Sequence, residues 1–303
     1  MSTFAELDRA GAIQRYIDIA HRLPSAAMPK TTTSIDHLGQ LLDDIDVFVL
    51  DGFGVLNVGA DPVPGAVERI KFLQQNGKQV LVLTNGATVP VASTVEKYRS
   101  WGFEFNIQDV VSSRNALEEA VANCDSAIKW GVVARQGAQI ELLAPHVSML
   151  EDDAVVYDQA EAFIFLGSSD WTESRHALLV NSLKRNKRRL LVGNPDLVAP
   201  QASGMSLEPG FFSHGLADIE VCEPEFYGKP FGPVFDIVAR QIENVPNHRI
   251  AMVGDSLHTD ILGGAAYGWR TVLIKEHGLL QGSDHEALFR ASGIRADFVA
   301  STT

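Results

Sequence analysis

Asp51 is the first of several polar side chains that follow apolar, strand-like runs in this sequence. It comes directly after Val47–Leu50, within the motif Asp51-Gly52-Phe53-Gly54. Open α/β sheets bind their ligands beyond the carboxyl ends of the strands, so a carboxylate at this point is a candidate nucleophile or metal ligand. Asp-Gly after a strand is also a common turn sequence, and the motif taken alone favours that reading.

The second motif, Thr84-Asn85-Gly86, follows the apolar run Val80–Leu83. A hydroxyl group and the backbone N–H groups of the turn after it can together hold phosphate oxygens. Asn-Gly is itself a very common turn, so this motif alone is only a weak indication of a phosphate site.

The third motif, Gly228-Lys229-Pro230, stands just before a predicted helix. Glycine and proline constrain the backbone around the lysine, whose ammonium group is a point charge able to neutralise a phosphate or a carboxylate. A surface lysine before a helix is the alternative interpretation.

The fourth motif places two carboxylates after another apolar run, in Gly254-Asp255 and, four intervening residues later, Asp260. Mg²⁺ in proteins uses one or two carboxylates together with water and phosphate oxygens. Asp260 could instead cap the N-terminus of the helix that follows. This motif is the most specific of the four, and the ordered set is more informative than any member.

Alternating strand-like and helical patterns separate these motifs and indicate a parallel sheet with crossover helices. Strands are predicted at 47–50, 79–83, 110–111, 249–253, 271–274 and 298–299, and helices at 64–76, 89–101, 113–123, 231–243 and 260–267. The middle of the chain has its own alternation, with strands at 127–133, 162–166 and 189–192 and a basic helix at 182–189. We therefore predict an α/β protein with a Rossmann-like, doubly wound parallel-sheet core and an inserted, smaller α/β domain.

The boundaries of these parts follow from the same patterns. Residues 1–34 are predicted to hold an N-terminal helix (5–23), with Tyr16 among its apolar positions, and a linker rich in Ser, Thr, Pro and Ala (24–34). The core is assigned to 35–123 and 222–303, and the inserted domain to 124–221.

The order of the four motifs resembles the signature motifs of the haloacid dehalogenase-like (HAD) hydrolases. Residues 124–221 resemble the type-two cap domain of the 4-nitrophenylphosphatase and sugar-phosphatase branch (class IIA). The sequence Gly193-Asn194-Pro195-Asp196 is similar to a cap motif of that branch. The resemblance covers roughly residues 40–300 and leaves the N-terminal helix outside it.

The resemblance implies a role for each residue that contacts the phosphoryl group. Asp51 would be the nucleophile that forms an aspartyl-phosphate. Thr84, with the backbone of Asn85 and Gly86, would bind the transferring group. Lys229 would stabilise its negative charge, so that transfer proceeds in line with electrostatic stabilisation of the equatorial oxygens.

The resemblance also implies a Mg²⁺ site. Asp51, Asp255 and the main-chain carbonyl of Phe53 would be its protein ligands. Asp260 would lie one shell further out and orient Lys229 or a metal-bound water.

Phe53 is a departure from the family pattern. The family's phosphatases carry a second aspartate here, which protonates the leaving alcohol and then activates water, and a phenyl ring can do neither. General acid–base catalysis is worth about 10²–10⁴-fold in rate. Three alternatives stay open: another group, such as His258 or His214, replaces the acid; the phosphoenzyme is long-lived; or the protein binds a phosphorylated ligand without turning it over.

Composition restricts the partners. The net charge of −13 argues against general nucleic-acid binding, and no apolar run approaches the ~20 residues of a membrane span. The N-terminus lacks the pattern of a secretory signal, and the two cysteines, Cys124 and Cys222, are predicted to be free thiols in a reducing cytoplasm.

The function expected from these features is Mg²⁺-dependent hydrolysis of a small phosphorylated metabolite, such as a sugar phosphate. The cap would select the substrate and exclude water. The alternative from another class is a catalytically impaired protein that binds a phosphorylated ligand in a regulatory role. A flavodoxin-like or dinucleotide-binding domain is disfavoured, because no glycine-rich fingerprint follows the first strand. An exposed cap face or the N-terminal helix could support a homodimer.

Overall fold

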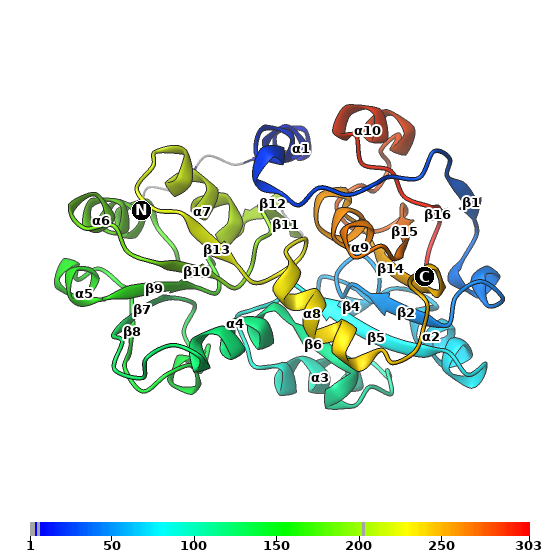
Figure 1. The fold of residues 1–303 in the computed structure, drawn as a ribbon, viewed down its shortest axis with the longest axis horizontal. Helices are drawn as coiled ribbons and strands as arrows, with labels where there is room; N and C mark the ends of the chain where they lie inside the picture. The colour runs from blue at the N-terminus through cyan, green and yellow to red at the C-terminus, as the bar shows by residue number, and fades with distance from the viewer. Residues whose placement is uncertain (1–3, 5–6, 202–203) are drawn as a thin grey trace. The chain divides into compact units, whose positions relative to one another are not determined.

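The computed structural model describes residue 4 and residues 7–201 and 204–303. The chain forms two compact units. The core unit comprises Gln14–Thr84, Val91–Val111 and Lys229–Thr303. The second unit comprises Asn85–Pro90, Ser112–Gly228 and the described residues up to Ile13. Each unit is built on its own parallel sheet (Figure 1).

The sheet of the core unit has seven strands. Their order across the sheet is β1 (Thr33–Ile35), β16 (Phe298–Ala300), β15 (Arg270–Ile274), β14 (Ile250–Gly254), β2 (Val47–Leu50), β5 (Gln79–Thr84) and β6 (Val110–Ser112). Leu50 is level with Val82 of β5 and with Val253 of β14. The residues that follow these three strands therefore emerge at the same edge of the sheet, which is where the first, second and fourth motifs lie.

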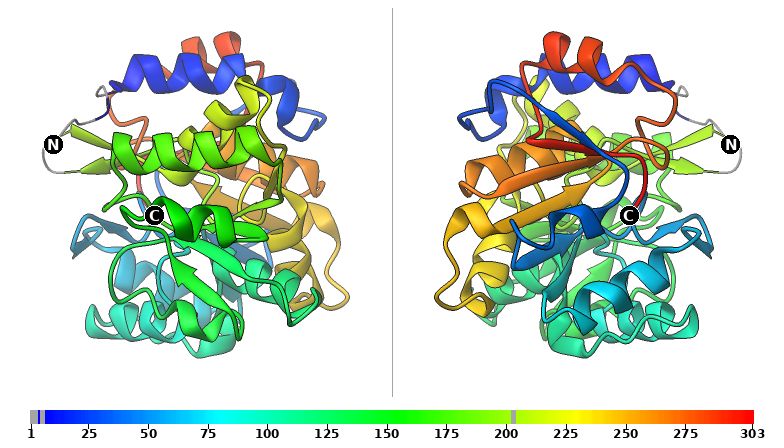
Figure 2. Two further views of the ribbon diagram at one scale, coloured as in Figure 1. Left: turned by 90° about the vertical axis from the view of Figure 1, so that its left-hand side faces the viewer. Right: turned by 90° about the vertical axis from the view of Figure 1, so that its right-hand side faces the viewer.

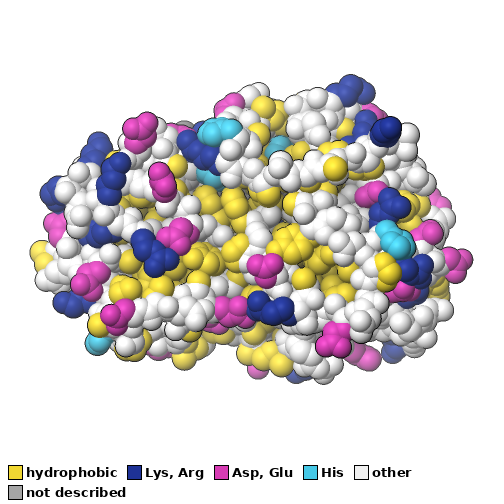
Figure 3. Space-filling model, in the orientation of Figure 1, with side chains coloured by type: hydrophobic (Ala, Val, Ile, Leu, Met, Phe, Trp, Pro, Cys, Tyr) yellow, Lys and Arg dark blue, Asp and Glu magenta, His cyan; other side chains and the backbone are white. Residues whose placement is uncertain are grey.

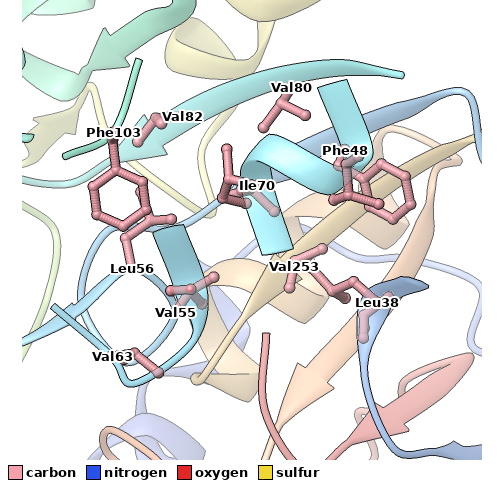
Figure 4. Close-up of a cluster of buried hydrophobic side chains, with 14 of the residues drawn as sticks. Leu38, Phe48, Val55, Leu56, Val63, Ile70, Val80, Val82, Phe103 and Val253 are labelled. Carbon is pink, nitrogen blue, oxygen red and sulfur yellow. The ribbon is translucent and has the colours of Figure 1, made fainter. Parts of the chain in front are cut away.

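Helices cover both faces of this sheet (Figure 2). One face packs against α2 (Ala66–Gln75) and α3 (Val91–Ser100), through a cluster that includes Phe48, Ile70 and Val253 (Figure 4). On the other face, α8 (Gly232–Gln241) packs against α9 (Leu262–Ala266), where the rings of Phe235 and Tyr267 stack at 4.9 Å. Because both faces are covered, β2 is buried along its whole length, as expected for a parallel strand.

The remaining core elements are short. They include the strands β3 (Asn57–Val58) and β4 (Asp61–Pro62), which form a hairpin after the first motif, and the helix α10 (His285–Ser292) between β15 and β16.

The second unit has a five-stranded parallel sheet. Its order is β13 (Pro224–Phe226), β10 (Leu190–Val192), β9 (Ala162–Phe165), β7 (Trp130–Val133) and β8 (Val147–Met149). The unit also holds a hairpin of β11 (Val198–Gln201) and β12 (Gly204–Leu207), and the helices α4 (Ser113–Ala122), α5 (Ala154–Gln159), α6 (Glu173–Arg185) and α7 (Pro209–Asp218).

The predicted α/β class with parallel sheets in a Rossmann-like arrangement is confirmed. Several local predictions need correction. Part of the predicted linker forms the edge strand β1, because parallel pairing with β16 gives Thr33–Ile35 an extended conformation that its sequence does not specify. The helix predicted at 182–189 instead begins at Glu173, where Thr172 caps it, and ends at Arg185.

The N-terminal helix α1 (Arg9–Asp18) is shorter than predicted and is followed by a 3₁₀ turn at Ala20–Arg22; residues 5–6 of the predicted helix lie outside the described residues. Both cysteines are free thiols. Of the helices that the structure describes, none combines the length and hydropathy needed to cross a bilayer. On the face shown in Figure 3, acidic and basic side chains are interspersed, so the net negative charge is not gathered into one field there.

Candidate active site

Asp51 lies at the end of β2, with only 14% of its side chain exposed. Its Oδ1 accepts a hydrogen bond from the Gly52 amide at 2.6 Å and lies 2.7 Å from Lys229 Nζ. The carboxylate is thus held in one orientation beside a cation, as a nucleophile that attacks in line requires.

Lys229 connects two carboxylates. Its side chain is 1% exposed, and Nζ lies 2.7 Å from Asp51 Oδ1 and 2.7 Å from Asp260 Oδ1. Burial acts to lower the pKa of Lys229, but the charges of Asp260 and Asp51 outweigh it, and the pKa is raised above its usual value. Lys229 therefore stays protonated at neutral pH and supplies a fixed positive charge.

Asp255 is seated between two glycine backbones. A Cβ atom on Gly54 would lie 2.6 Å from Asp255 Cγ, and one on Gly278 would overlap Asp255 Oδ2. Both glycines have positive φ, +74° and +75°, a conformation that other residues rarely adopt. Leu279 N donates to Asp255 Oδ2 at 2.6 Å, so the loop after β15 fixes this carboxylate.

Three carboxylates gather around the single ammonium group of Lys229. One oxygen from each of Asp51, Asp255 and Asp260 lies within 4.8 Å of the others. Burial, and then the neighbouring carboxylates, raise the pKa of Asp255 well above its usual value. Burial also raises the pKa of Asp260 to about 7, against the lowering effect of Lys229.

The excess of negative charge at this cluster suits a divalent cation. Hard cations such as Mg²⁺ prefer carboxylate oxygens and keep several waters or phosphate oxygens in their coordination shell. Asp51 and Asp255 would supply the oxygens, and a cation between them would offset the burial and the neighbouring carboxylate charges that raise the pKa of Asp255. The donor set therefore fits Mg²⁺.

The fourth motif forms a π-helical turn, Leu257–Ile261, directly after the strand that ends at Gly254. Asp260 Oδ2 accepts a hydrogen bond from Ser256 N at 3.1 Å, while Oδ1 faces Lys229. Asp260 is completely buried, so it does not simply cap an exposed helix end.

Thr84 lies half-buried at the end of β5, the strand beside β2. Its Oγ1 lies 3.6 Å from the point where a Cβ on Gly52 would stand, and the hydroxyl group of Tyr98 adjoins the same point. Tyr98 is 1% exposed, and burial followed by the charge of Asp51 raises its pKa above the usual range. Sequence reasoning did not identify Tyr98, since nothing distinguishes it from other aromatic residues on a helix.

The second motif is divided between the two units. Thr84 belongs to the core unit, whereas Asn85 and Gly86 belong to the second unit. There, Asn85 Nδ2 donates to Asp196 Oδ1 at 2.8 Å. The structure thus brings Asn85 to the Gly193–Asp196 motif, a contact that the separation of the two motifs in sequence conceals.

Phe53 is half-buried and forms an isolated parallel bridge with Asn57. His258 is also unsuited to be a replacement acid: its ring is buried against Tyr16, and burial lowers its pKa to about 4, so it is neutral at pH 7. His214 is 1% exposed and stacks on Phe226 within the second unit at 4.6 Å.

Two family models match the chain. The haloacid dehalogenase-like hydrolase model matches residues 48–147, and the HAD-hydrolase-like model matches residues 226–302. Together they include all four motifs in the predicted order. The chain belongs to the haloacid dehalogenase-like hydrolases.

Curated relatives and solved structures agree with this assignment. The acid sugar phosphatase of Staphylococcus aureus is 23% identical over 228 residues, which is 75% of this chain and 85% of that protein. A structure described as a possible sugar phosphatase, from Cytophaga hutchinsonii, superposes with a TM-score of 0.77 at 22% identity, covering 91% of this chain and 98% of that one. The 4-nitrophenylphosphatase of Thermotoga maritima superposes with a TM-score of 0.70 at 24% identity, covering 86% of this chain and 96% of that one. At these identities the two structures show the shared fold.

Proposed function

We propose that this protein is a Mg²⁺-dependent phosphatase that hydrolyses a small phosphorylated metabolite, such as a sugar phosphate, through an aspartyl-phosphate on Asp51. The observation that carries the proposal is the position of Lys229, 2.7 Å from both Asp51 and Asp260, beside a third carboxylate in Asp255. Relatives named as sugar phosphatases and 4-nitrophenylphosphatases support the substrate class.

In the first step, an Asp51 carboxylate oxygen forms a bond to phosphorus while the bond from phosphorus to the substrate oxygen breaks. Lys229 and the Thr84 hydroxyl group bind the oxygens of the transferring group. Asp51, Asp255 and the Phe53 carbonyl would hold Mg²⁺, which would neutralise the negative charge of the nucleophile and of the phosphate. Asp260 holds Lys229 in place, because its carboxylate pairs with the same ammonium group as the carboxylate of Asp51 does.

Phe53 determines how fast such a reaction runs. The leaving oxygen receives no proton from position 53 and must take one from water, and the later attack of water on the aspartyl-phosphate has no base at this position. We therefore expect slow turnover with alkyl phosphates and faster turnover with good leaving groups such as 4-nitrophenolate, because a stable anion needs no proton to leave.

Residues 124–221 would act as the cap that selects the substrate, and self-association as a homodimer stays a prediction. The second candidate function is that of a binding protein for a phosphorylated ligand. It is favoured by Phe53 alone, which removes the acid–base group while leaving the phosphate and metal contacts in place.

A phosphatase assay separates the two functions. Purified protein is incubated with Mg²⁺ and a panel of phosphomonoesters that includes 4-nitrophenyl phosphate, alongside Asp51→Asn. The exposed Asp61 lies in the hairpin after the first motif, so Asp61→Asn is the matched carboxylate control. Release of phosphate that Asp51→Asn abolishes and Asp61→Asn preserves supports the enzyme.

The Phe53→Asp variant tests the missing acid. We expect its rate with alkyl phosphates to rise by about 10²-fold or more, while the rate with 4-nitrophenyl phosphate rises less. No release of phosphate by the unaltered protein or by Phe53→Asp, together with measurable binding of phosphate esters, would overturn the enzyme in favour of the binding protein.

A further inference from the structure

Tyr16 lies in α1, before both segments that the family models match, and it contacts the fourth motif. Its ring stacks on the imidazole of His258, with the ring centroids 4.7 Å apart and the planes 7° from parallel. Tyr16 is 3% exposed and His258 is 5% exposed. Both belong to the core unit, so the stack is formed within one compact part of the protein.

His258 is part of the turn that carries the site carboxylates. Asp255 stands just before Leu257–Ile261, and Asp260 stands within it. Ser256 O accepts from both Asp260 N and Ile261 N at 3.2 Å, so an α-helical i to i+4 bond and a π-helical i to i+5 bond share one acceptor. π-helical turns are rare, occur mostly as single turns within α-helices, and are frequent at functional sites.

The turn therefore needs support from packing to keep its shape. Its conformation places Asp260 Oδ1 at 2.7 Å from Lys229 and allows Oδ2 to accept from Ser256 N. Asp260 lies inside the loop that the bond from Ile261 N to Ser256 O closes, so opening of this turn would let its carboxylate move away from Lys229 and from Ser256 N. The Tyr16 ring lies flat against the side chain at position 258, two residues before Asp260.

We propose that Tyr16 is a positioning residue: by stacking on His258 it holds the Leu257–Ile261 turn in the conformation in which Asp255 and Asp260 serve the metal and phosphate site. The inference rests on the proposed function, which assigns metal and phosphate binding to that site. It adds α1, which lies outside both matched segments, to the elements that shape the site. Hydrogen-bonding partners of metal ligands typically alter metal affinity by ~10–100-fold when removed. Tyr16 acts through His258 rather than by bonding to a ligand, so its effect is expected at the lower end of that range.

The test uses the full-length protein and Mg²⁺ alone as the probe. Mg²⁺ affinity is obtained from the rise of the thermal unfolding midpoint with Mg²⁺ concentration, and hydrogen–deuterium exchange reports the protection of amides 255–262. Tyr16→Leu removes the ring and keeps apolar volume, whereas Tyr16→Phe keeps the ring. Ile19→Ala, at a residue 1% exposed and three positions further on, removes buried volume from the same segment without removing an aromatic ring.

We expect Tyr16→Leu to weaken Mg²⁺ binding by about 10-fold and to increase exchange in 255–262. Tyr16→Phe, which keeps the ring, should stay closer to the unaltered protein than Tyr16→Leu in both measurements, and Ile19→Ala should change neither by more than about 2-fold. His258→Ala should weaken binding as Tyr16→Leu does. The double variant should be no weaker than either single variant, since both remove one contact.

Two results would overturn the inference. The first is that Tyr16→Leu binds Mg²⁺ as tightly as the unaltered protein, whether or not hydrogen–deuterium exchange in 255–262 increases. The second is that the losses of Mg²⁺ affinity in Tyr16→Leu and His258→Ala add fully in the double variant. If the unaltered protein itself gains no stability from Mg²⁺, the metal role in the proposed function fails and the inference fails with it. The measurement on the unaltered protein therefore separates failure of the proposed function from failure of the inference alone.

Discussion

Leu279 donates its backbone N–H to Asp255 Oδ2 at 2.6 Å, and this bond joins the loop after β15 to the carboxylate after β14. Gly278 makes the bond possible, because its lack of a Cβ lets the backbone approach the carboxylate. A residue that sequence reasoning placed in no motif thus determines where a predicted metal ligand points.

Replacing Gly278 by alanine should therefore damage the site. The new Cβ would overlap Asp255 Oδ2, and the φ of +75° is strained for alanine. We expect a loss of about 1–2 kcal/mol of unfolding free energy from the backbone conformation and a fall in Mg²⁺ affinity of ~10-fold from the displaced carboxylate. Chemical denaturation and Mg²⁺-dependent thermal shifts measure the two effects.

Gly282→Ala is the matched control for this experiment. Gly282 has nearly the same φ, +74°, but no atom lies within 4 Å of its Cβ position. It should lose similar stability and keep Mg²⁺ affinity. Equal losses of Mg²⁺ affinity in the two variants would contradict the claim that Gly278 sets the position of the Asp255 carboxylate.

Lys229→Met should destabilise the core unit strongly. The ammonium group is buried between Asp51 and Asp260, and its removal takes away the counter-charge that contacts both carboxylates. Breaking such a pair by removing one partner costs about 3–5 kcal/mol. Urea denaturation of the two proteins without Mg²⁺ gives the difference.

Lys71→Met is the control for the loss of a lysine charge. Lys71 pairs with Glu104 at 3.6 Å, with side chains 57% and 74% exposed. Exposed pairs contribute ~0–1 kcal/mol, so this variant should be close to the unaltered protein. A loss below about 1 kcal/mol in Lys229→Met would show that the buried pairs do not act as described.

Arg114→Met should destabilise the second unit. The Arg114 side chain is completely buried, and its guanidinium donates to Thr88 O at 3.1 Å, Ala138 O at 2.6 Å, Gln139 O at 2.9 Å and Glu118 Oε1 at 2.8 Å. Methionine leaves those carbonyls without their donor, at an expected cost of about 3–5 kcal/mol. Urea denaturation followed by tryptophan fluorescence provides the measurement.

Arg114→Lys separates charge from hydrogen-bond geometry. Lysine keeps the charge but cannot reproduce the planar fork, so it should recover less than half of the lost stability. Full recovery in Arg114→Lys would show that only the charge matters.

Stability should fall on mild acidification, partly because of His176. Burial lowers the pKa of His176 from 6.5 to about 4. Between these values the unfolded chain binds more protons than the folded protein, so the free energy of unfolding decreases as pH falls from about 6.5 to about 4. From pH 7 to pH 5 we expect His176 to account for about 1–2 kcal/mol.

His176→Phe keeps a ring beside Phe212 and removes the titrating group. Denaturation curves at pH 7 and pH 5 should therefore differ less for this variant than for the unaltered protein. An identical pH dependence in both would show that His176 does not titrate between the folded and unfolded states in this range.

The sequence by itself determined the fold class and singled out candidate site residues. Parallel strands buried on both faces are continuous apolar runs, so Val47–Leu50 and Ile250–Gly254 can be predicted from the local sequence alone. The polar residues that follow these strands mark the edge of the sheet. Asp51, Thr84 and Asp255 come together because the strands that they end or follow are neighbours in register. Lys229 lies before α8 and Asp260 lies within the π-helical turn, so their contact is decided by tertiary packing. Their catalytic roles stay predictions.

Other features depended on contacts between distant residues and left no local pattern. Thr33–Ile35 becomes a strand only because β16 pairs with it. The sequence does not distinguish Gly278 from the other glycines among the 25 in the chain, and only the structure shows its contact with Asp255. The sequence predicted that Tyr16 lies on a helix, but the tertiary structure alone placed its ring on His258. A periodic pattern specifies which face of an element is buried, whereas the partner of that face is decided by how the whole chain packs.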